Sequence, residues 1–402
     1  MIQRIKEETA RRHADMIAWR RHLHAHPELS FAEHTTGAYI AEQLRGLGIG
    51  VREGVAGTGV IGMVQGAGPG QGCICLRADI DALPIQEANT CDYRSVNDGV
   101  MHACGHDAHA AMVLGAGAVL HELRDRWSGT VHLLFQPGEE KIPGGATLVL
   151  NEDALRDPRP TLIIGQHCTP ELELGKLGFR AGPFMASSDE LYVTVKGKGG
   201  HAAQPAKLID PIMITAHLLP RLKADFAERY GAASTPSLLA FGKVEALGAT
   251  NVVPDVVKLA GTLRAFNEEQ RADMHQWLPE RARAICAEHR GSCDLKVLKG
   301  YPVLVNDPAL TERMRAIAIE LVGERNVVEM DIRMGSEDFA FYTHVMPGCF
   351  FRLGTGLPGT PVRNLHTPTF DINEEALRIG SAMMALAAVR ELGNGYQQTG
   401  HP

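Results

Sequence analysis

The sequence predicts an α/β protein, in which a larger domain with a central, mostly parallel sheet flanked by helices carries an inserted, smaller α+β domain. Two observations favour this fold class. Short apolar runs recur along the chain, and each is followed by a polar loop and then by a stretch of helical character. Near Ala186 the pattern changes to alternating strands and two long helical stretches, as in an antiparallel sheet with two helices. We therefore expect residues 1–185 and 300–402 to form the larger domain, and residues 186–299 to form the inserted one.

Four apolar runs predict strands of the larger domain, and each leads to residues that can bind a metal ion. Ligands of open α/β sheets bind beyond the carboxyl ends of the strands, so these residues can converge although they lie far apart in the sequence. The runs and the residues they lead to are Cys73–Arg77 with Asp79 and Asp81, Val131–Phe135 with Glu139 and Glu140, Thr161–Gly165 with His167, and Cys349–Leu353 with a Gly/Pro-rich loop that contains His366.

Two helices complete the predicted larger domain. Helix propensity is high from Asp107 to Leu123, so Cys104 and His106 should lie just before the first turn of this helix. Small residues along it favour close packing on the sheet. The C-terminal helix should begin near Asn373.

The predicted inserted domain begins with an alternating strand and a glycine-rich turn that leads into His201. Two helices and three further strands should follow. In chain order these elements are the strand Asp189–Lys196, the turn Gly197–Gly200, a helix from about Pro211, strands at Leu238–Glu245 and Val256–Arg264, a helix over Asn267–His289 and a strand at Cys293–Leu298.

The composition is that of an ordinary soluble globular protein. The 402 residues are 45% hydrophobic and 22% charged, and this length predicts two to three domains. A net charge of -7 without a basic cluster argues against binding to nucleic acid. The N-terminus lacks an apolar signal core, and no segment approaches the roughly 18 apolar residues of a membrane span. Because the eight cysteines have no regular spacing, they fit reduced thiols. We expect a cytoplasmic protein with a small-molecule substrate and no membrane partner.

One apparent motif has the wrong context. Gly57, Gly59 and Gly62 spell GxGxxG, and Asp81 follows about twenty residues later, as in a dinucleotide-binding fingerprint. However, Val60–Val64 is strand-like, whereas the fingerprint requires a helix to open at this point and bind the pyrophosphate. The sequence therefore argues against a nicotinamide cofactor.

The segment Met101–His109, MHACGHDAH, has the highest density of metal-binding side chains. It contains His102, Cys104, His106 and His109, and imidazole and thiolate are the groups that hold divalent transition metals. Taken singly, the glutamates and histidines at the other strand ends would be solvated charges or hydrogen-bonded loop residues. Taken together with this segment, they predict a two-metal hydrolase.

Other candidate polar groups favour structural roles. His22, His24 and His26 precede Pro27 at a predicted helix end, where we expect capping or packing. A second polar group, Ser336, Glu337 and Asp338, favours a helix N-cap over a functional site.

Motifs along nearly the whole chain resemble those of the metal-dependent aminoacylase and carboxypeptidase family. The resemblance is to its amidohydrolase subgroup, typified by hippurate hydrolase and the indole-acetyl-amino-acid hydrolases. The order and spacing of the motifs make it specific. They are RRHLHAHPELSFAEHTT, RADIDALPIQE, MHACGHDAHAAM, FQPGEE, GKGGHAA, ATNVVP, GTLRAF, MGSEDFAFY and LHTPTFDINEEAL.

This resemblance implies a role for each candidate residue. The larger domain would be catalytic, and the inserted one would be a lid and dimerisation domain. The implied ligands of two divalent metals are Cys104, His106, Glu140, His167 and His366, with Glu139 as the general base; the implied substrate contacts are His201, Asn251 and Arg264, the first two often reaching across a dimer. Asp81 would orient a ligand or the CGHD loop, and we place Asp79 and His109 in similar outer positions, with a structural role equally open for His109 and His102.

The expected chemistry agrees with these roles. Two cations about 3.5 to 4 Å apart can share a water and lower its pKa from ~15.7 towards ~7. Because Glu139 and Glu140 cannot point the same way, one can bind metal while the other takes the proton of that water. His201 could donate a hydrogen bond to the oxyanion, and Arg264 could bind a substrate carboxylate or, alternatively, a structural ion-pair partner.

These inferences predict a cytoplasmic enzyme that hydrolyses the amide of N-acyl-L-amino acids and forms a homodimer or homotetramer. Zinc, manganese, cobalt and nickel all suit the mixed thiolate, imidazole and carboxylate ligands. One alternative is a carboxypeptidase or dipeptidase with the same chemistry. Another is a metal-binding protein without turnover, whose expected signature, the loss of Glu139, is not present.

Overall fold

The computed structural model describes residues 1–393 and divides the chain into two compact units. The larger unit contains residues 1–182, 305–331 and 338 onward, and the smaller unit contains residues 183–304 and 332–337. The predicted inserted domain, residues 186–299, lies inside the smaller unit. The short strands β7 (Gly182–Met185) and β14 (Leu304–Asn306) occur where the chain passes from one unit to the other.

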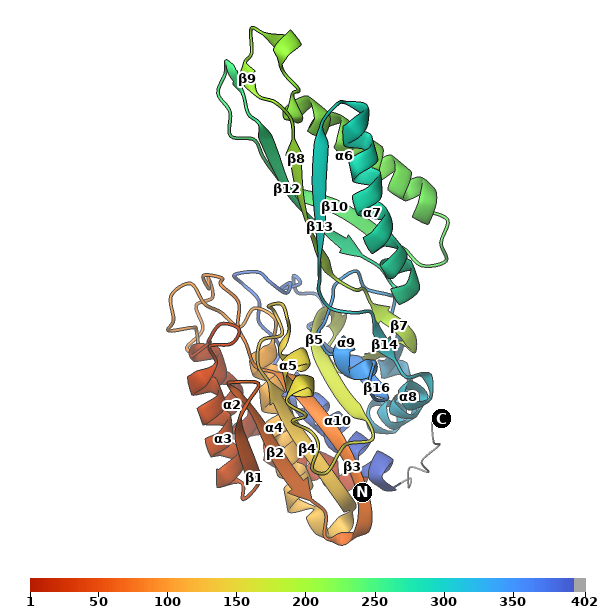
Figure 1. Cartoon of the computed structure of the whole chain (residues 1–402). Coiled ribbons are helices and arrows are strands. Elements are labelled where there is room, and N and C mark those ends of the chain that lie inside the picture. Colours follow the sequence, from red (N-terminus) through yellow and green to blue (C-terminus); the bar gives the residue numbers. More distant parts are fainter. Residues whose placement is uncertain (394–402) are drawn as a thin grey trace. The chain divides into compact units, whose positions relative to one another are not determined.

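The larger unit is built on an eight-stranded sheet with the order β1-β2-β4-β3-β5-β16-β6-β15 (Figure 1). Its central strands β4, β3, β5 and β16 run parallel, and β15 runs parallel to β6, whereas the β1–β2, β2–β4 and β16–β6 pairs are antiparallel. The mostly parallel sheet is as predicted. The strands are β1 (Gly50–Val55), β2 (Gly59–Gln65), β3 (Gly68–Asp79), β4 (Ser128–Gln136), β5 (Ile163–Glu173), β6 (Leu177–Phe179), β15 (Val327–Glu329) and β16 (Gly348–Gly356).

Helices flank this sheet, and α4 and α10 form the centre of its core. Close packing requires glycine on α4, because a Cβ at Gly117 would lie 2.3 Å from Leu133 Cδ1 and one at Gly115 would lie 2.4 Å from Met16 Sδ. The helices of this unit are α1 (Ile2–Arg11), α2 (His13–Ala25), α3 (His34–Gly46), α4 (His106–Glu122), α5 (Gly145–Asn151), α8 (Pro308–Val322), α9 (Ala340–Thr343) and α10 (Glu375–Gly393), with 3-10 turns at Arg124–Arg126 and Glu324–Asn326.

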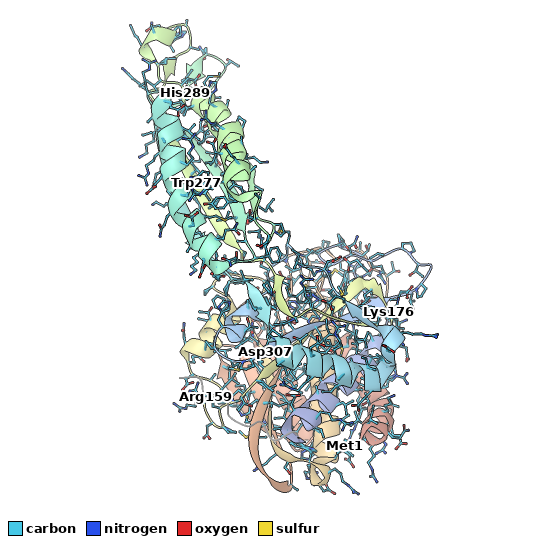
Figure 2. The ribbon with its side chains drawn as sticks, turned by 90° about the vertical axis from the view of Figure 1, so that its right-hand side faces the viewer. Met1, Arg159, Lys176, Trp277, His289 and Asp307 are labelled. Atoms are coloured by element: carbon cyan, nitrogen blue, oxygen red, sulfur yellow. The ribbon has the colours of Figure 1, made fainter. Side chains whose placement is uncertain are left out.

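The smaller unit is an antiparallel sheet with the order β10-β12-β8-β13 and two long helices (Figures 1 and 2). Alternate residues of β8, such as Leu191 and Val193, point into a core that Leu218 of α6 and Leu278 of α7 complete. The elements are β8 (Asp189–Lys196), β9 (Gly200–His201), a 3-10 turn at Pro205–Lys207, α6 (Pro211–Tyr230), β10 (Leu238–Glu245), β11 (Val252–Val253), β12 (Val256–Arg264), α7 (Glu268–Glu288) and β13 (Ser292–Lys299).

Two predicted boundaries in the larger unit are wrong. Strand β5 does not end at Gly165 but continues to Glu173, because β16 pairs with it beyond this point and Arg352 lies opposite His167. His167 therefore projects from a strand and not from a loop. Helix α4 begins at His106 itself, so only Cys104 precedes it.

The expectation about the GxGxxG run agrees with the structure. Gly62 lies within β2, which pairs with strands on both sides, and the next element is β3, so the GxGxxG run opens no helix. Among residues 1–393, no helix is long and apolar enough to cross a membrane.

Candidate metal centre

The five predicted metal ligands come together at one end of the central strands of the larger unit. Cys104 precedes α4, His106 opens it, and His167 lies in β5, while Glu140 follows β4 and His366 lies in the loop between β16 and α10. Their donor atoms form overlapping groups in which all atoms lie within 4.8 Å of one another. These groups are Cys104, His106 and His167; Cys104, Glu140 and His366; and His106, Glu139 and Glu140.

Hydrogen bonds from Nδ1 to backbone carbonyls orient two of the predicted ligand histidines, His106 and His167. His106 Nδ1 donates to the carbonyl oxygen of Asp81 at 2.8 Å, and His167 Nδ1 donates to that of Cys168 at 2.7 Å. Because a carbonyl only accepts, Nδ1 carries a proton in both rings, so in the neutral form of each ring the lone pair is on Nε2. His106 Nε2 is buried without a hydrogen-bond partner among the described residues. An orphaned lone pair of this kind fits a bound metal ion.

The remaining donors meet at Cys104. Its Sγ lies 3.4 Å from Nε2 of His167 and 3.4 Å from Nε2 of His366, and His366 Nε2 lies 3.2 Å from Glu140 Oε1. One thiol, three imidazoles and one carboxylate thus converge, which is a ligand set for zinc or a related divalent ion.

Unusual backbone conformations occur next to Cys104 and at His366, two of the predicted ligands. Gly105 has a φ of 89°, and a Cβ there would lie 3.2 Å from the Cβ of Cys168, so the turn between Cys104 and His106 requires glycine. His366 has a φ of 59°, in the left-handed region that side chains rarely adopt, and its amide donates to the Ala103 carbonyl at 2.7 Å. Strain of this kind persists where neighbouring structure enforces it.

The electrostatics of the centre favour a cation. Hydrogen bonds with Cys104 and Glu140 raise the pKa of His366 to about 10, whereas burial lowers the pKa of His167 well below its ordinary value. Burial also raises the pKa of the Cys104 thiol. Protons therefore balance the acidic donors here, and metal binding would replace them.

His109 and Asp79 form a hydrogen bond with each other. The Cys168 amide donates to His109 Nε2 at 2.9 Å, so His109 Nδ1 carries a proton and donates it to Asp79 Oδ1 at 2.6 Å. Asp79 Oδ2 also accepts from Arg77 Nη1 at 2.6 Å. These two side chains form a compact group with His106, but His109 has no ring nitrogen left for a metal.

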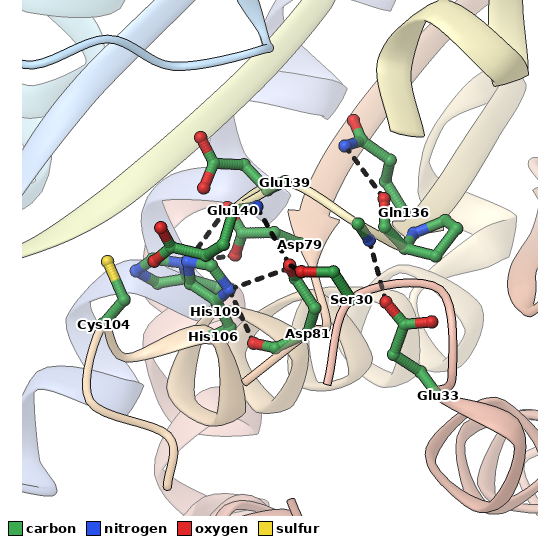
Figure 3. A network of polar contacts seen from close by, with 12 residues as sticks. Ser30, Glu33, Asp79, Asp81, Cys104, His106, His109, Gln136, Glu139 and Glu140 are labelled. Atoms are coloured by element: carbon green, nitrogen blue, oxygen red, sulfur yellow. Dashed lines mark hydrogen bonds and ion pairs between the residues drawn. The ribbon is translucent and has the colours of Figure 1, made fainter. Parts of the chain in front are cut away.

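Asp81 connects a predicted ligand to the turn that follows β4 (Figure 3). Its Oδ1 lies 3.2 Å from His106 Nδ1, while its Oδ2 accepts from Ser30 Oγ at 2.7 Å and from the Glu140 amide at 2.9 Å. Asp81 is buried, so this carboxylate orients His106 and Glu140 together.

Glu139 is buried beside the ligands, and its Oε1 accepts from the Asp338 amide at 3.4 Å. Asp338 lies just before α9, which begins at Ala340, and its predicted N-cap role stays a prediction. Its carboxylate accepts from Arg77 Nη2 at 2.7 Å and from Gln136 Nε2 at 2.8 Å. It helps to order the end of β4, next to Glu139.

Three further histidines, His24, His26 and His102, differ in their burial and contacts. His26 Nδ1 donates to the His22 carbonyl at 2.8 Å in the last turn of α2, which is the predicted capping. His24 is fully buried and lies 2.8 Å from the Asp107 carboxylate. His102 is also buried, which lowers its pKa to about 4 and keeps it neutral.

Sequence analysis missed two buried polar residues near the centre. Arg20 is fully buried and joins two ligand-bearing segments, donating to Asp107 at 2.8 Å and to Asp371 at 2.6 Å. Glu33 is fully buried as well and contacts the turn that carries Glu139. Charged residues in polar stretches give no sequence signal of burial, although both lie within the RRHLHAHPELSFAEHTT motif.

The three predicted substrate contacts lie in the smaller unit, at two separate places. His201 pairs with Val252 in the short β9–β11 ladder, and the neighbouring Asn251 carbonyl accepts from Ala202 at 3.0 Å. Arg264 lies at the opposite end of β12 from the β8 terminus that leads to this ladder. Nine strand residues span roughly 30 Å, so Arg264 and His201 of one chain are too far apart to hold one small molecule.

Arg264 has no ion-pair partner among the described residues. Its Nη1 donates to Ser336 Oγ at 2.8 Å, and burial lowers its pKa. The alternative of a structural ion pair therefore has no support in this conformation.

Comparison with known proteins identifies the family. Residues 75–390 match the profile of Peptidase family M20/M25/M40. The chain belongs to this family. An N-acyl-L-amino acid amidohydrolase of Geobacillus stearothermophilus is 39% identical over 305 residues, which are 76% of this chain and 80% of the relative. An IAA-amino acid hydrolase of Arabidopsis thaliana is 35% identical over 383 residues, 94% of this chain and 86% of the relative.

A solved structure of another family member supports the fold. The Bacillus subtilis protein YXEP, described as a dinuclear metal binding peptidase from the M20 family, is 34% identical and superposes with a TM-score of 0.82 over 95% of this chain and 98% of its own. These similarities confirm the family resemblance predicted from the motifs. The chain is a hydrolase that acts on amide bonds.

Proposed function

We propose that the chain is a dinuclear metal-dependent amidohydrolase that cleaves N-acyl-L-amino acids, of the N-acetyl or N-benzoyl type, into a carboxylate and a free amino acid. The observation that carries this proposal is the convergence of Nε2 of His106, His167 and His366 on Cys104 and Glu140, with the buried Glu139 directly beside them. The amidohydrolase named among its relatives supports the substrate class.

Cys104, His106, Glu140, His167 and His366 would hold two divalent ions, and zinc, manganese, cobalt and nickel all suit these donors. When bound, such ions polarise a scissile carbonyl and lower the pKa of water towards neutrality.

Glu139 would act as the general base that takes the proton of the attacking water. Its neighbour Glu140 has its amide held by Asp81 and its carboxylate near His366, so Glu139 remains for acid/base chemistry. The Glu139 carboxylate accepts a proton from the attacking water and delivers it to the nitrogen of the leaving amine. Such help is worth about 10² to 10⁴ in rate.

The smaller unit would supply substrate contacts from two copies of the chain. Arg264, whose Nη1 donates to Ser336, has no ion-pair partner among the described residues and could bind the α-carboxylate of the substrate bidentately. His201 and Asn251 lie at the other end of the sheet, so we propose that they reach a substrate bound by a partner chain, where His201 donates to the oxyanion. A homodimer or homotetramer in the cytoplasm fits this arrangement.

A carboxypeptidase or dipeptidase activity is the second candidate, because the family and the related structure are both described as peptidases. Both activities use the same centre. They differ in whether the group on the carbonyl side of the amide is an acyl chain or an amino acid.

The deciding experiment measures amine release from N-acetyl amino acids, N-benzoyl amino acids and dipeptides, with manganese- or zinc-loaded protein and a chelated control. Release from the acyl amino acids that is lost on chelation supports the proposal, and release from dipeptides alone favours the peptidase. We expect Glu139→Gln to retain the metal content of the wild type and to lose at least about a hundredfold in turnover. A fully active Glu139→Gln variant would exclude Glu139 as the base.

A further inference from the structure

We propose that Glu33 is a positioning residue that fixes the turn carrying Glu139 and Glu140. This inference rests on the proposed amide hydrolysis at that turn. Glu33 lies about a hundred residues before the turn in the sequence and contacts none of the five predicted metal ligands.

The turn is held on both sides of Glu139 by buried carboxylates (Figure 3). On one side, the Gly138 amide donates to Glu33 Oε1 at 2.8 Å. On the other, the Glu140 amide donates to Asp81 Oδ2 at 2.9 Å. With the amides of both neighbours fixed, the backbone of Glu139 has little freedom to shift. Asp81 also contacts His106, whereas Glu33 contacts none of the predicted metal ligands.

Glu33 is buried among hydrogen-bond donors and has no counter-charge within ion-pair distance among the described residues. Its side chain is fully buried, and its partners are neutral: the amides of Phe31 at 2.9 Å and Gly138 at 2.8 Å, and Thr58 Oγ1 at 2.6 Å. No cation lies within ion-pair distance of Glu33 among the described residues. Burying a carboxylate without a counter-charge opposes folding, so the three hydrogen bonds to Glu33 have to offset that cost. The carboxylate therefore points to a task that hydrogen bonding performs.

Backbone strain marks the same contact. Phe31 has a φ of 65°, which is unfavourable for a bulky residue, and its amide donates to the same Oε1 that accepts from Gly138. Gly138 has a φ of 63°, and a Cβ there would lie 2.2 Å from Phe31 Cε1. One oxygen of Glu33 thus binds the amides of both Phe31 and Gly138, two residues with left-handed backbone conformation that lie on different segments.

Ser30 provides a second link between the two segments. Its Oγ donates at 2.7 Å to the same Asp81 oxygen that accepts the Glu140 amide. The segment from Ser30 to Glu33 therefore follows the base-bearing turn along its length. Replacing Glu33 alone should remove the hydrogen bond of the Gly138 amide and leave the hydrogen bond between the Glu140 amide and Asp81 intact.

The test compares three substitutions of Glu33 in the full-length, metal-loaded protein. Glu33→Gln keeps an acceptor for both amides and should retain kcat within about threefold. Glu33→Met removes the acceptors at similar size, and Glu33→Asp withdraws the carboxylate by one carbon. Both should lower kcat at least about tenfold with KM within threefold and unchanged metal content, because displacing a catalytic group by about 1 Å costs on the order of 10² in rate.

A second readout does not depend on activity. Hydrogen exchange of the chelated protein, followed on peptides that span Gln136 to Lys141, should show faster exchange at Gly138 in Glu33→Met and unchanged exchange at Glu140. The matched control is Glu28→Met. Glu28 lies in the same segment and accepts amides of Thr35 and Thr36 at 3.2 and 2.8 Å, but none from the turn, so its kcat and its Gly138 exchange should match the wild type.

The outcomes separate the two proposals. If the wild type hydrolyses no amide with any metal, the proposed function fails, and exchange at Gly138 still tests the contact. If the wild type is active, a folded Glu33→Met with wild-type kcat overturns the role of Glu33. Should Glu33→Met fail to fold, a Glu33→Asp variant with wild-type kcat, or a Glu33→Gln variant as impaired as Glu33→Asp, overturns it equally.

Discussion

Asp189 and Arg271 form a buried ion pair in the smaller unit. Removing the charge of Asp189 should reduce the free energy of unfolding by an amount that depends on pH. Asp189, at the start of β8, is 1% exposed and accepts from Arg271 at 2.6 and 2.9 Å, from His275 at 2.7 Å and from the Gly300 amide at 3.1 Å. Burial opposes the ionisation of Asp189, but the hydrogen bonds from His275 and Arg271 outweigh it and lower the pKa to about 2. The perturbation is Asp189→Asn, which keeps the shape and removes the charge.

The magnitude follows from that pKa. Lowering it from the ordinary 3.8 to about 2 corresponds to about 2 kcal/mol of stability. Because the folded pKa is depressed, this contribution is fully present above pH 3.8 and is lost as the pH falls through about 2; roughly half is gone by pH 3. Asp189→Asn also leaves the buried Arg271 with Glu268 as its remaining carboxylate partner, so the total loss at pH 7 should lie near the lower end of the roughly 3 to 5 kcal/mol typical of a broken buried pair.

Urea unfolding at pH 7 and pH 3 measures this loss, with Trp277 fluorescence as a probe of the smaller unit. The control is Asp294→Asn, since Asp294 is exposed and lies 3.9 Å from Lys296, a pair worth less than about 1 kcal/mol. A loss below about 1 kcal/mol for Asp189→Asn at pH 7, or one that does not shrink by about 1 kcal/mol towards pH 3, would refute the reasoning.

Two further predictions concern the metal centre and its turn. Cys104→Ser should lower the metal content measured by elemental analysis by at least one ion per chain, because Cys104 belongs to two ligand groups; unchanged content would contradict its role as a ligand. Gly145→Ala should destabilise the protein by at least about 2 kcal/mol in urea unfolding, because its Cβ would lie 1.7 Å from the Pro137 carbonyl oxygen, and an unchanged midpoint would show that the turn relaxes without penalty.

The smaller unit shows where sequence patterns suffice. Alternation over Asp189–Lys196 predicts the bounds of β8, since one face of this strand packs on α6 and α7 and the other does not. The predicted strands at Leu238–Glu245 and Val256–Arg264 also match the structure. Burial alternates along β8 and at Val257, Leu259 and Leu263 of β12, whereas burial along β10 does not alternate.

In the larger unit, local sequence patterns do not suffice to predict the elements around the metal centre. The extent of β5 depends on pairing with β16, which begins almost two hundred residues later, so no local pattern around His167 could reveal it. Likewise, Asp338 and Glu33 lie in polar stretches typical of a surface, and only the fold buries them against the turn after β4. Their roles depend on partners that are distant in sequence.

The set of metal ligands illustrates a selection that the sequence alone leaves open. Several acidic side chains lie near the centre, and the structure separates them by their partners. Asp79 and Asp338 both bind Arg77, and Asp107 binds Arg20, so these carboxylates are neutralised by buried guanidinium groups. Glu140, in contrast, has no arginine partner among the described residues, and its carboxylate lies beside His366, an imidazole that can release its proton to a competing metal ion.

The two buried arginines therefore do more than join segments of the chain. Arg20 and Arg77 compensate the charges of Asp107, Asp79 and Asp338, whereas the predicted ligands Cys104 and Glu140 have no arginine partner among the described residues. A cation that enters this site would gain most at a position where no arginine already compensates the charge. We therefore expect the surrounding charges to influence which side chains bind the metal, in addition to the chemistry of the ligands themselves.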